Sequence, residues 1–173
     1  EENSHILIYE FGGAAVHAGL MTVGLPGRGG RITAEQVLAA VPAKAKTVDQ
    51  NATILSLEDT HNSSGGRVWP LDELESVVDA ARDAGLAAHL DGARLFNAAV
   101  AQDVPPATIA GRFDSVTICL SKGLGCPLGA LIAARVDSFV LSWQHQVLKS
   151  HLAVLRHVPM HLSQIAETLA ATP

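Results

Sequence analysis

A lysine and an aspartate stand where two apolar stretches of the sequence end, and both could take part in covalent chemistry. Lys122 follows an apolar run at 115–120, and Asp91 follows another at 86–90. Desolvation at the end of a buried strand would leave part of the lysine amine unprotonated and able to attack a carbonyl. The alternative is a lysine whose stem crosses the apolar surface and whose charge reaches water.

Asp91 could complement this lysine, because a carboxylate can keep the nitrogen of a pyridine ring protonated and so make the ring an electron sink. Arg94 lies three residues further on and offers a bidentate donor fork for the carboxylate of an amino acid. Both residues also have simpler interpretations. Asp91 could cap the following helix, and Arg94 could form an ion pair with Asp91.

Three further groups of residues favour structural interpretations. The glycine-rich segment 24–30 fits neither GxGxxG nor the P-loop pattern and is predicted to be a mobile connecting loop. Cys119 and Cys126 form no CxxC motif and are predicted to be buried thiols. Four late histidines do not share one helix face, so we predict no metal site. They are His145, His151, His157 and His161.

These candidate residues need a parallel sheet to bring them together. Short apolar runs at 52–57, 86–90 and 115–120 have the length of buried strands. Helical patterns alternate with them, and this rhythm predicts an α/β fold with a mainly parallel sheet and crossover helices. Ligands of such sheets bind at the carboxyl ends of the strands, where Asp91 and Lys122 are expected.

Three helices are predicted from their apolar spacing and end signals. The first begins with a capping box formed by Thr33 and Gln36 and ends at Pro42. The second is expected to begin with a capping box at Asp72 and Glu75, to carry an apolar face of leucine, valine and alanine, and to stop at a glycine at position 85. A short third helix is expected over 93–101.

The composition limits the class of protein and of partner. The chain has 173 residues, of which 48% are hydrophobic and 17% charged, so it is expected to form about one packed domain. A net charge of -5 disfavours nucleic acid and anionic membrane surfaces as partners. The sequence shows neither an apolar run of roughly 18 residues nor a signal-peptide pattern, and we expect a cytoplasmic protein that binds a small molecule.

Three sequence blocks, in order, resemble a known family. They are EDTHN at 58–62 followed by Gly65 and Gly66, HLDGARLFNA at 89–98, and SKGLG at 121–125 followed by Pro127 and Gly129. Together they resemble the threonine aldolase family of fold type I pyridoxal-phosphate enzymes. Similarity at His5, Tyr9-Glu10 and 12–16 extends the resemblance over residues 5–136.

The resemblance implies a cofactor, a reaction and roles for four residues. Lys122 would form the Schiff base with pyridoxal 5'-phosphate, Asp91 would bind the ring nitrogen, and Arg94 would contact the substrate carboxylate. His5 matches the histidine that the family stacks on the cofactor ring, although its place near the start of the chain also suits a frayed residue. The implied reaction cleaves a β-hydroxy-α-amino acid to glycine and an aldehyde, in a protein expected to be a homo-oligomer.

The sequence also departs from the family pattern. The phosphate-binding loop would lie before Glu1, so the 173 residues alone are expected to bind the cofactor weakly and to turn over threonine near background. A second histidine of the family would fall at Val48, which leaves His5 and His61 as candidates for the base that takes the β-hydroxyl proton. Asp59 replaces the usual asparagine.

The chain is expected to divide into two parts. Residues 1–136 would form part of the cofactor-binding large domain, and 137–173 a divergent helical tail. Two alternatives to a threonine aldolase remain open. One is another fold type I enzyme, either a β-eliminating lyase or an aminotransferase, and the other is a truncated relative that catalyses nothing.

Overall fold

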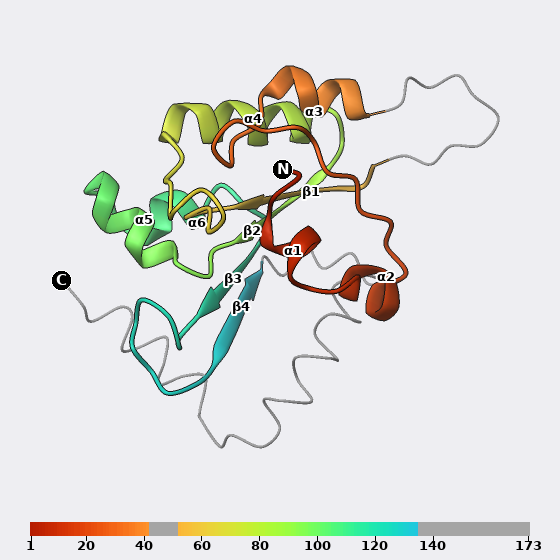
Figure 1. Cartoon of the computed structure of the whole chain (residues 1–173). Coiled ribbons are helices and arrows are strands. Elements are labelled where there is room, and N and C mark those ends of the chain that lie inside the picture. The colour runs from red at the N-terminus through yellow and green to blue at the C-terminus, as the bar shows by residue number, and fades with distance from the viewer. Residues whose placement is uncertain (42–51, 135–173) are drawn as a thin grey trace.

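The computed structural model describes residues 1–41 and 52–134, and this part of the chain contains one four-stranded sheet (Figure 1). Its strands are β1 (Ile54–Glu58), β2 (Ala87–Asp91), β3 (Ser115–Cys119) and β4 (Ala130–Ala134), in that spatial order. β1, β2 and β3 run parallel, and β4 runs antiparallel to β3. The predicted α/β fold with a mainly parallel sheet is confirmed.

The crossover helices lie on one face of the sheet because the parallel strands are added in one direction and such connections are right-handed. α4 (Leu71–Asp83) links β1 to β2, and α5 (Leu95–Gln102) with α6 (Pro106–Ala110) links β2 to β3. The predicted apolar face of α4 is confirmed, since its four residues are all buried in the core. They are Leu74, Val77, Val78 and Ala81.

Side chains alternate between the two faces of the strands, and this period of two separates a core face from a polar face. Leu55, Leu57, Ala88, Leu90 and Val116 are buried in the core. The intervening positions carry a second, polar set, and the register aligns its members across the sheet. They are Ser56 and Glu58 of β1, His89 and Asp91 of β2, and Ser115 and Thr117 of β3.

The fourth strand was not predicted from the sequence. Ten residues separate the end of β3 from the start of β4, which is too short for a crossover of a dozen or more residues, so the chain returns antiparallel. This connection contains Lys122. A backbone bond from the Leu120 N–H to the Gly129 carbonyl, 2.9 Å, closes its base.

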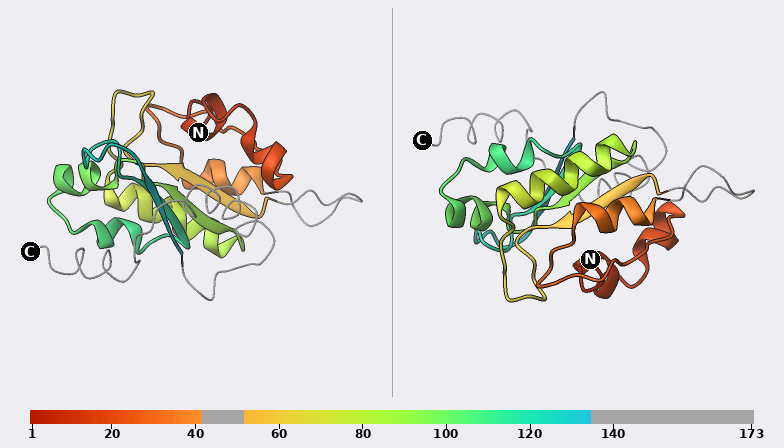
Figure 2. Two further views of the ribbon diagram at one scale, coloured as in Figure 1. Left: turned by 90° about the horizontal axis from the view of Figure 1, so that it is seen from below. Right: turned by 90° about the horizontal axis from the view of Figure 1, so that it is seen from above.

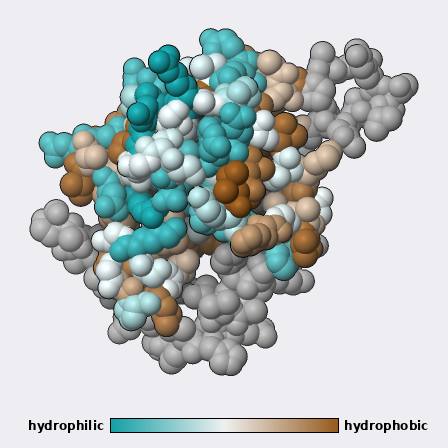
Figure 3. All heavy atoms as spheres, viewed as in Figure 1, coloured by the Kyte–Doolittle hydropathy of each residue, from teal (hydrophilic) through white to brown (hydrophobic). Residues whose placement is uncertain are grey.

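The N-terminal segment lies on the other side of the sheet from α4 (Figure 2). It contains the short helices α1 (His5–Ile8) and α2 (Gly13–Ala18), neither of which was predicted, and it leads to α3 (Ala34–Ala40). Apolar side chains of residues 8–23 remain on the surface, and Figure 3 shows apolar atoms gathered over α1. The most exposed of them are Phe11, Val16, Met21 and Val23.

The predicted helix starts have different outcomes. The capping box of α3 is confirmed, since Thr33 Oγ1 accepts from the Gln36 N–H and Gln36 Oε1 accepts from the Thr33 N–H. The box predicted at Asp72 and Glu75 is wrong, because α4 begins at Leu71, its N-cap is Pro70, and it has no side-chain cap. Asp72 instead lies in the first turn, where its charge favours the helix dipole.

The glycine-rich segment 24–30 is a connecting loop, as predicted, and its C-terminal end is packed against the body of the protein. Arg28 and Arg31 form a β-bridge, and the Gly30 backbone lies directly on the imidazole of His61. Gly30 has a φ of +84°, and a Cβ at this position would collide with the buried ring. Glycine is therefore required here by both conformation and space.

The two cysteines lie within the described residues, whereas several other residues that the sequence analysis named do not. Cys119 is half-buried and Cys126 is exposed, so the prediction of two buried thiols is wrong for Cys126 because it stands in the open β3–β4 connection. Val48, the four late histidines and the tail at 137–173 lie outside the described residues.

Candidate active site

Asp91 is the last residue of β2, and its side chain lies on the polar face of the sheet. Its Oδ1 accepts a hydrogen bond from the Ala93 N–H at 3.1 Å, and the described residues offer Oδ2 no hydrogen bond. The N-cap of α5 is Arg94, so the alternative in which Asp91 caps this helix is wrong. One carboxylate oxygen of Asp91 is therefore available to a ligand at the strand end.

Lys122 lies in the β3–β4 connection, three residues beyond the end of β3. Its carbonyl accepts from the Gly125 N–H at 3.0 Å, which makes a tight turn of the loop. A Cβ at Gly123 would collide with Asn97 of α5, so the lysine loop lies against that helix. Lys122 is half-buried, so it is less buried than the sequence analysis expected. Within the described chain its amine makes no ion pair.

The close approach of β2 and β3 brings these two residues to one edge of the sheet. Gly92, directly after Asp91, is buried, and a Cβ there would lie 3.0 Å from the Thr117 carbonyl oxygen and from a Val116 methyl group. Because the carboxyl ends of adjacent parallel strands meet at one edge, Asp91 and the loop of Lys122 share that edge.

Arg94 follows at the start of α5 and is half-buried. It makes no ion pair with Asp91 or with any other described residue, so the alternative of an Asp91–Arg94 pair is wrong. An unpaired guanidinium three residues from Asp91 is suited to binding an incoming carboxylate.

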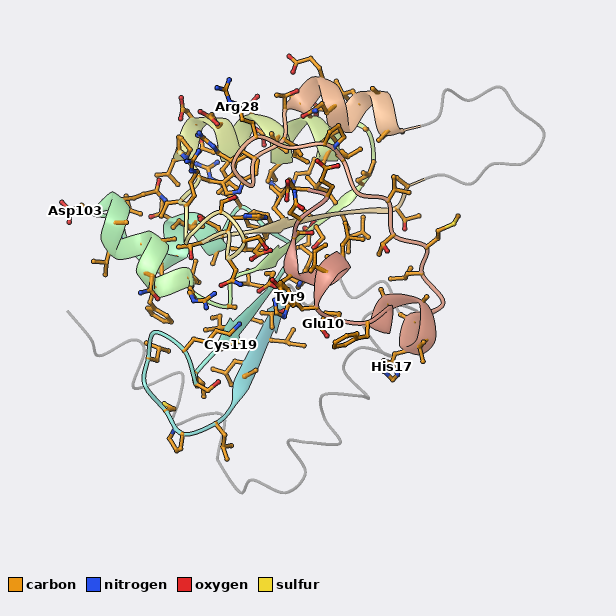
Figure 4. All side chains as sticks on the ribbon, in the orientation of Figure 1. Tyr9, Glu10, His17, Arg28, Asp103 and Cys119 are labelled. Carbon is orange, nitrogen blue, oxygen red and sulfur yellow. The ribbon has the colours of Figure 1, made fainter. Side chains whose placement is uncertain are left out.

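His5 reaches the same edge from the N-terminal segment. Its backbone N–H donates to Oε2 of Glu58 at 2.7 Å, and Glu58 is the register partner of Asp91. The alternative of a frayed residue is therefore wrong. The His5 ring lies 5.1 Å from the Tyr9 ring centroid, and its Nε2 is 3.2 Å from Oε1 of Glu10. Figure 4 labels Tyr9 and Glu10, where the α1–α2 segment crosses the polar side of the sheet.

His61, the second candidate base, is enclosed. Its side chain is 1% exposed, its Nδ1 lies 2.8 Å from Ser64 Oγ, and its Nε2 lies 3.0 Å from Oε2 of Glu1. The Gly30 backbone covers one side of the ring. In this arrangement the His61 ring is packed beneath the site and does not face a ligand.

His89 lies beneath Asp91 on the same face of β2 and joins β2 to β3. Its Nδ1 is 2.8 Å from Ser115 Oγ, and its Nε2 is 3.3 Å from Thr117 Oγ1. Burial lowers the pKa of the His89 imidazole to about 4, although Asp91 and a hydrogen bond with the Ser115 backbone act in the opposite direction. The imidazole is therefore neutral at physiological pH and supports the strand pair through hydrogen bonds.

Asp59 is a fully buried carboxyl group next to Glu58. Its Oδ1 accepts from the Trp69 N–H at 3.3 Å, and Oδ2 finds no hydrogen-bond partner within the described residues. Burial raises the pKa of Asp59 to about 7, and the Trp69 bond acts in the opposite direction. A protonated Asp59 would resemble the asparagine that the family usually has at this position.

Glu58, His89 and Asn97 are parts of this edge that the sequence analysis did not single out. Glu58 had a signal, because it ends a buried strand just as Asp91 does. His89 also had one, since it stands two residues before Asp91 and must share its face. The contact of Asn97 with Gly123 had none, because it joins a helix to a loop far along the chain.

Two classes of feature are absent from residues 1–41 and 52–134. No group of three or more His, Cys, Asp or Glu side chains in these ranges is arranged to hold a metal ion. No helix there has the length and apolar character that crossing a bilayer requires.

Comparison with known proteins gives consistent matches. Low-specificity L-threonine aldolase 1 of Arabidopsis thaliana is 38% identical over 141 residues, which are 80% of this chain and 39% of the relative. The low specificity L-threonine aldolase of Escherichia coli is 38% identical over 136 residues, 78% of this chain and 39% of the relative. The chain thus spans about two fifths of the length of these relatives.

A solved structure supports the fold. The threonine aldolase of Leishmania major superposes with a TM-score of 0.73 at 24% identity, over 87% of this chain and 43% of that one. At this identity the likeness concerns the fold alone. The family model described as beta-eliminating lyase matches residues 1–169, nearly the whole sequence. The resemblance identified from the sequence is confirmed, and the chain belongs to the beta-eliminating lyase family.

Proposed function

We propose that the protein is a pyridoxal-phosphate-dependent lyase that cleaves threonine-like β-hydroxy-α-amino acids to glycine and an aldehyde. The observation that carries the proposal is the placement of Asp91 and Lys122 after two adjacent parallel strands, each without an ionic partner among the described residues. Similarity to the threonine aldolases of Arabidopsis thaliana and Escherichia coli supports the choice of substrate.

The residues present fit this cofactor. Asp91 offers a carboxylate oxygen for the pyridine nitrogen, and the Lys122 amine can condense with the cofactor aldehyde. Gly92 and Gly123 let β2, β3 and α5 pack closely beside these two residues, and His5 can lie against the ring. The cofactor would supply an electron sink for the bond that breaks.

The chain's own residues would orient the substrate and move its proton. Arg94 would hold the substrate carboxylate through its donor fork. His5 is the better candidate for the base that accepts the β-hydroxyl proton, because it is half-exposed and paired with Glu10, whereas His61 is enclosed. Neutral His89 would support the strand pair beneath Asp91 through its hydrogen bonds with Ser115 and Thr117.

Borohydride reduction in the presence of pyridoxal phosphate tests the lysine assignment. The label is expected on the peptide that contains Lys122, because this lysine follows β3 at the sheet edge where Asp91 ends β2. Label on Lys44, Lys46 or Lys149 instead would overturn it. The reaction is then tested by incubating the purified protein with threonine and measuring glycine.

The name of the matching family favours one second candidate, a β-elimination. That reaction would break a bond of the substrate side chain to its leaving group and release ammonia and a 2-oxo acid in place of glycine. Measuring ammonia and glycine together with threonine and with serine separates the two reactions. A cytoplasmic location and a homo-oligomeric state remain predictions, and the exposed apolar side chains of residues 8–23 favour the second.

A further inference from the structure

Glu58 joins two separate segments of backbone at the end of β1. Its Oε2 accepts from the His5 N–H at 2.7 Å, and its Oε1 accepts from the Asn62 N–H at 2.8 Å. The first of these bonds connects residues 53 positions apart in the sequence. The Glu58 side chain therefore attaches the N-terminal segment to the sheet edge, and we call this pair of hydrogen bonds the clamp.

These two bonds require a side chain whose two terminal atoms both accept a hydrogen bond. Both partners are backbone donors, and an ionised carboxylate is the side-chain group of this size that accepts with two oxygens and donates nothing. Glu58 is buried, so a lost bond would leave a backbone N–H without a partner in a dry environment. The bond also serves α1, because His5 is its first residue and the Ser4 side chain does not cap it.

Glu58 is itself held through both its backbone and its side chain. The Trp69 indole N–H donates to the Glu58 carbonyl at 3.2 Å, and Trp69 is 1% exposed. Nε2 of His61 lies 3.9 Å from Glu58 Oε2, and the same nitrogen faces the Glu1 carboxylate. The clamp is thus built on a buried cluster rather than on a surface contact.

We propose that Glu58 is a positioning residue that holds His5 beside Asp91 and so sets the place of the imidazole against the cofactor ring. The register pairs Glu58 with Asp91, so a backbone tied to Glu58 is tied to the neighbour of the ring-binding carboxylate. The effect on the cofactor ring rests on the proposed function. The position of His5 rests on the hydrogen bonds of Glu58.

Amide hydrogen exchange in the cofactor-free protein tests the clamp directly. Glu58→Gln keeps the side-chain volume but offers one acceptor to two donors, so exchange at the amide of His5, of Asn62 or of both should become about tenfold faster. Exposed Glu73→Gln, which removes a charge from the Arg31 ion pair, is the matched control and should leave both amides unchanged. Unchanged protection at both amides in Glu58→Gln would overturn the proposal.

A double-mutant cycle on pyridoxal phosphate affinity tests whether Glu58 acts through His5. His5→Ala and Glu58→Gln should each weaken binding by about tenfold, and Glu58→Gln should add less than about twofold in the His5→Ala background. Equal losses in both backgrounds would show that Glu58 supports the site in another way. If Glu58→Gln does not fold, Glu58→Asp keeps the charge but shortens the reach, and it should free at least one of the two amides.

The two hypotheses fail separately. A wild-type protein that takes up no pyridoxal phosphate contradicts the proposed function, while the exchange measurement still decides whether Glu58 holds His5. A wild-type protein that binds the cofactor, together with an additive cycle, contradicts only the role of Glu58.

Discussion

Oδ1 of Asp91 accepts a hydrogen bond from the Ala93 N–H, and Oδ2 is available to a ligand. A substitution can therefore remove the charge of Asp91 and keep this bond. Asp91→Asn keeps an acceptor oxygen that can still bond the Ala93 N–H. The amide cannot hold a pyridinium charge, so glycine formation should fall by about 100-fold or more while the unfolding midpoint changes little. Steady-state rates of the full-length counterpart check the loss of activity, and urea unfolding of the purified chain checks the unfolding midpoint. Near-normal activity of the variant would leave Asp91 as a turn residue only.

Asp59 should make stability depend on pH. Its pKa is raised from 3.8 to about 7 in the folded protein, so the folded state holds a proton that the unfolded chain has lost between these values. Stability therefore falls as pH rises from about 4 to about 7 and stays low above that range. At pH 8, Asp59→Asn should be more stable than the wild type by up to about 4 kcal/mol, and at pH 4 the two should be similar.

Urea unfolding at the two pH values measures this difference. Exposed Asp79→Asn in α4 removes the same charge without changing a buried group, so it should shift stability little at either pH. A stability gain for Asp59→Asn that is equal at pH 4 and pH 8 would show that the buried carboxyl is not the titrating group.

At the scale of elements, the glycine segment 24–30 and the residues around His61 act as one packed unit. Gly30 and Gly65 have similar φ angles, +84° and +78°, but a Cβ would strike the His61 ring at Gly30 and would meet nothing within 4 Å at Gly65. Gly65→Ala should cost about 1 kcal/mol from backbone strain alone. Gly30→Ala should cost roughly 1 to 3 kcal/mol more, because the buried ring has no room to move. Equal losses in urea unfolding would contradict the packing described for Gly30.

The sequence predicted those elements whose residues repeat with a clear period. The parallel strands and the buried face of α4 followed from apolar spacing, and Asp91 and Lys122 followed from the rule that ligands bind at strand ends. α1 and α2 were missed because they are only four and six residues long and bury no side chain completely. The bond between His5 and Glu58 was missed because no local pattern reports a contact across 53 residues.

At the scale of the whole molecule, the apolar surface of residues 8–23 predicts association with a second copy. Phe11 is 93% exposed and Met21 is 72% exposed, which is unfavourable for two large apolar side chains in one segment. Phe11→Ser with Met21→Gln should shift the sedimentation equilibrium toward monomer. Val100→Ser removes a side chain that is 81% exposed on α5, away from this segment, and should not. A monomeric wild type would contradict the prediction.

The bond between His5 and Glu58 also fixes an order of events during folding. A helix of four residues such as α1 is not stable by itself, since helices shorter than about 12 residues are marginal in water. His5 is synthesised before β1, yet its place depends on a carboxylate that follows 53 residues later. The His5 N–H therefore cannot form this bond on the ribosome until β1 has emerged and closed this long loop. His5 is therefore among the earliest described residues to be made, yet it cannot take its place at the sheet edge before Glu58 is available to accept its N–H.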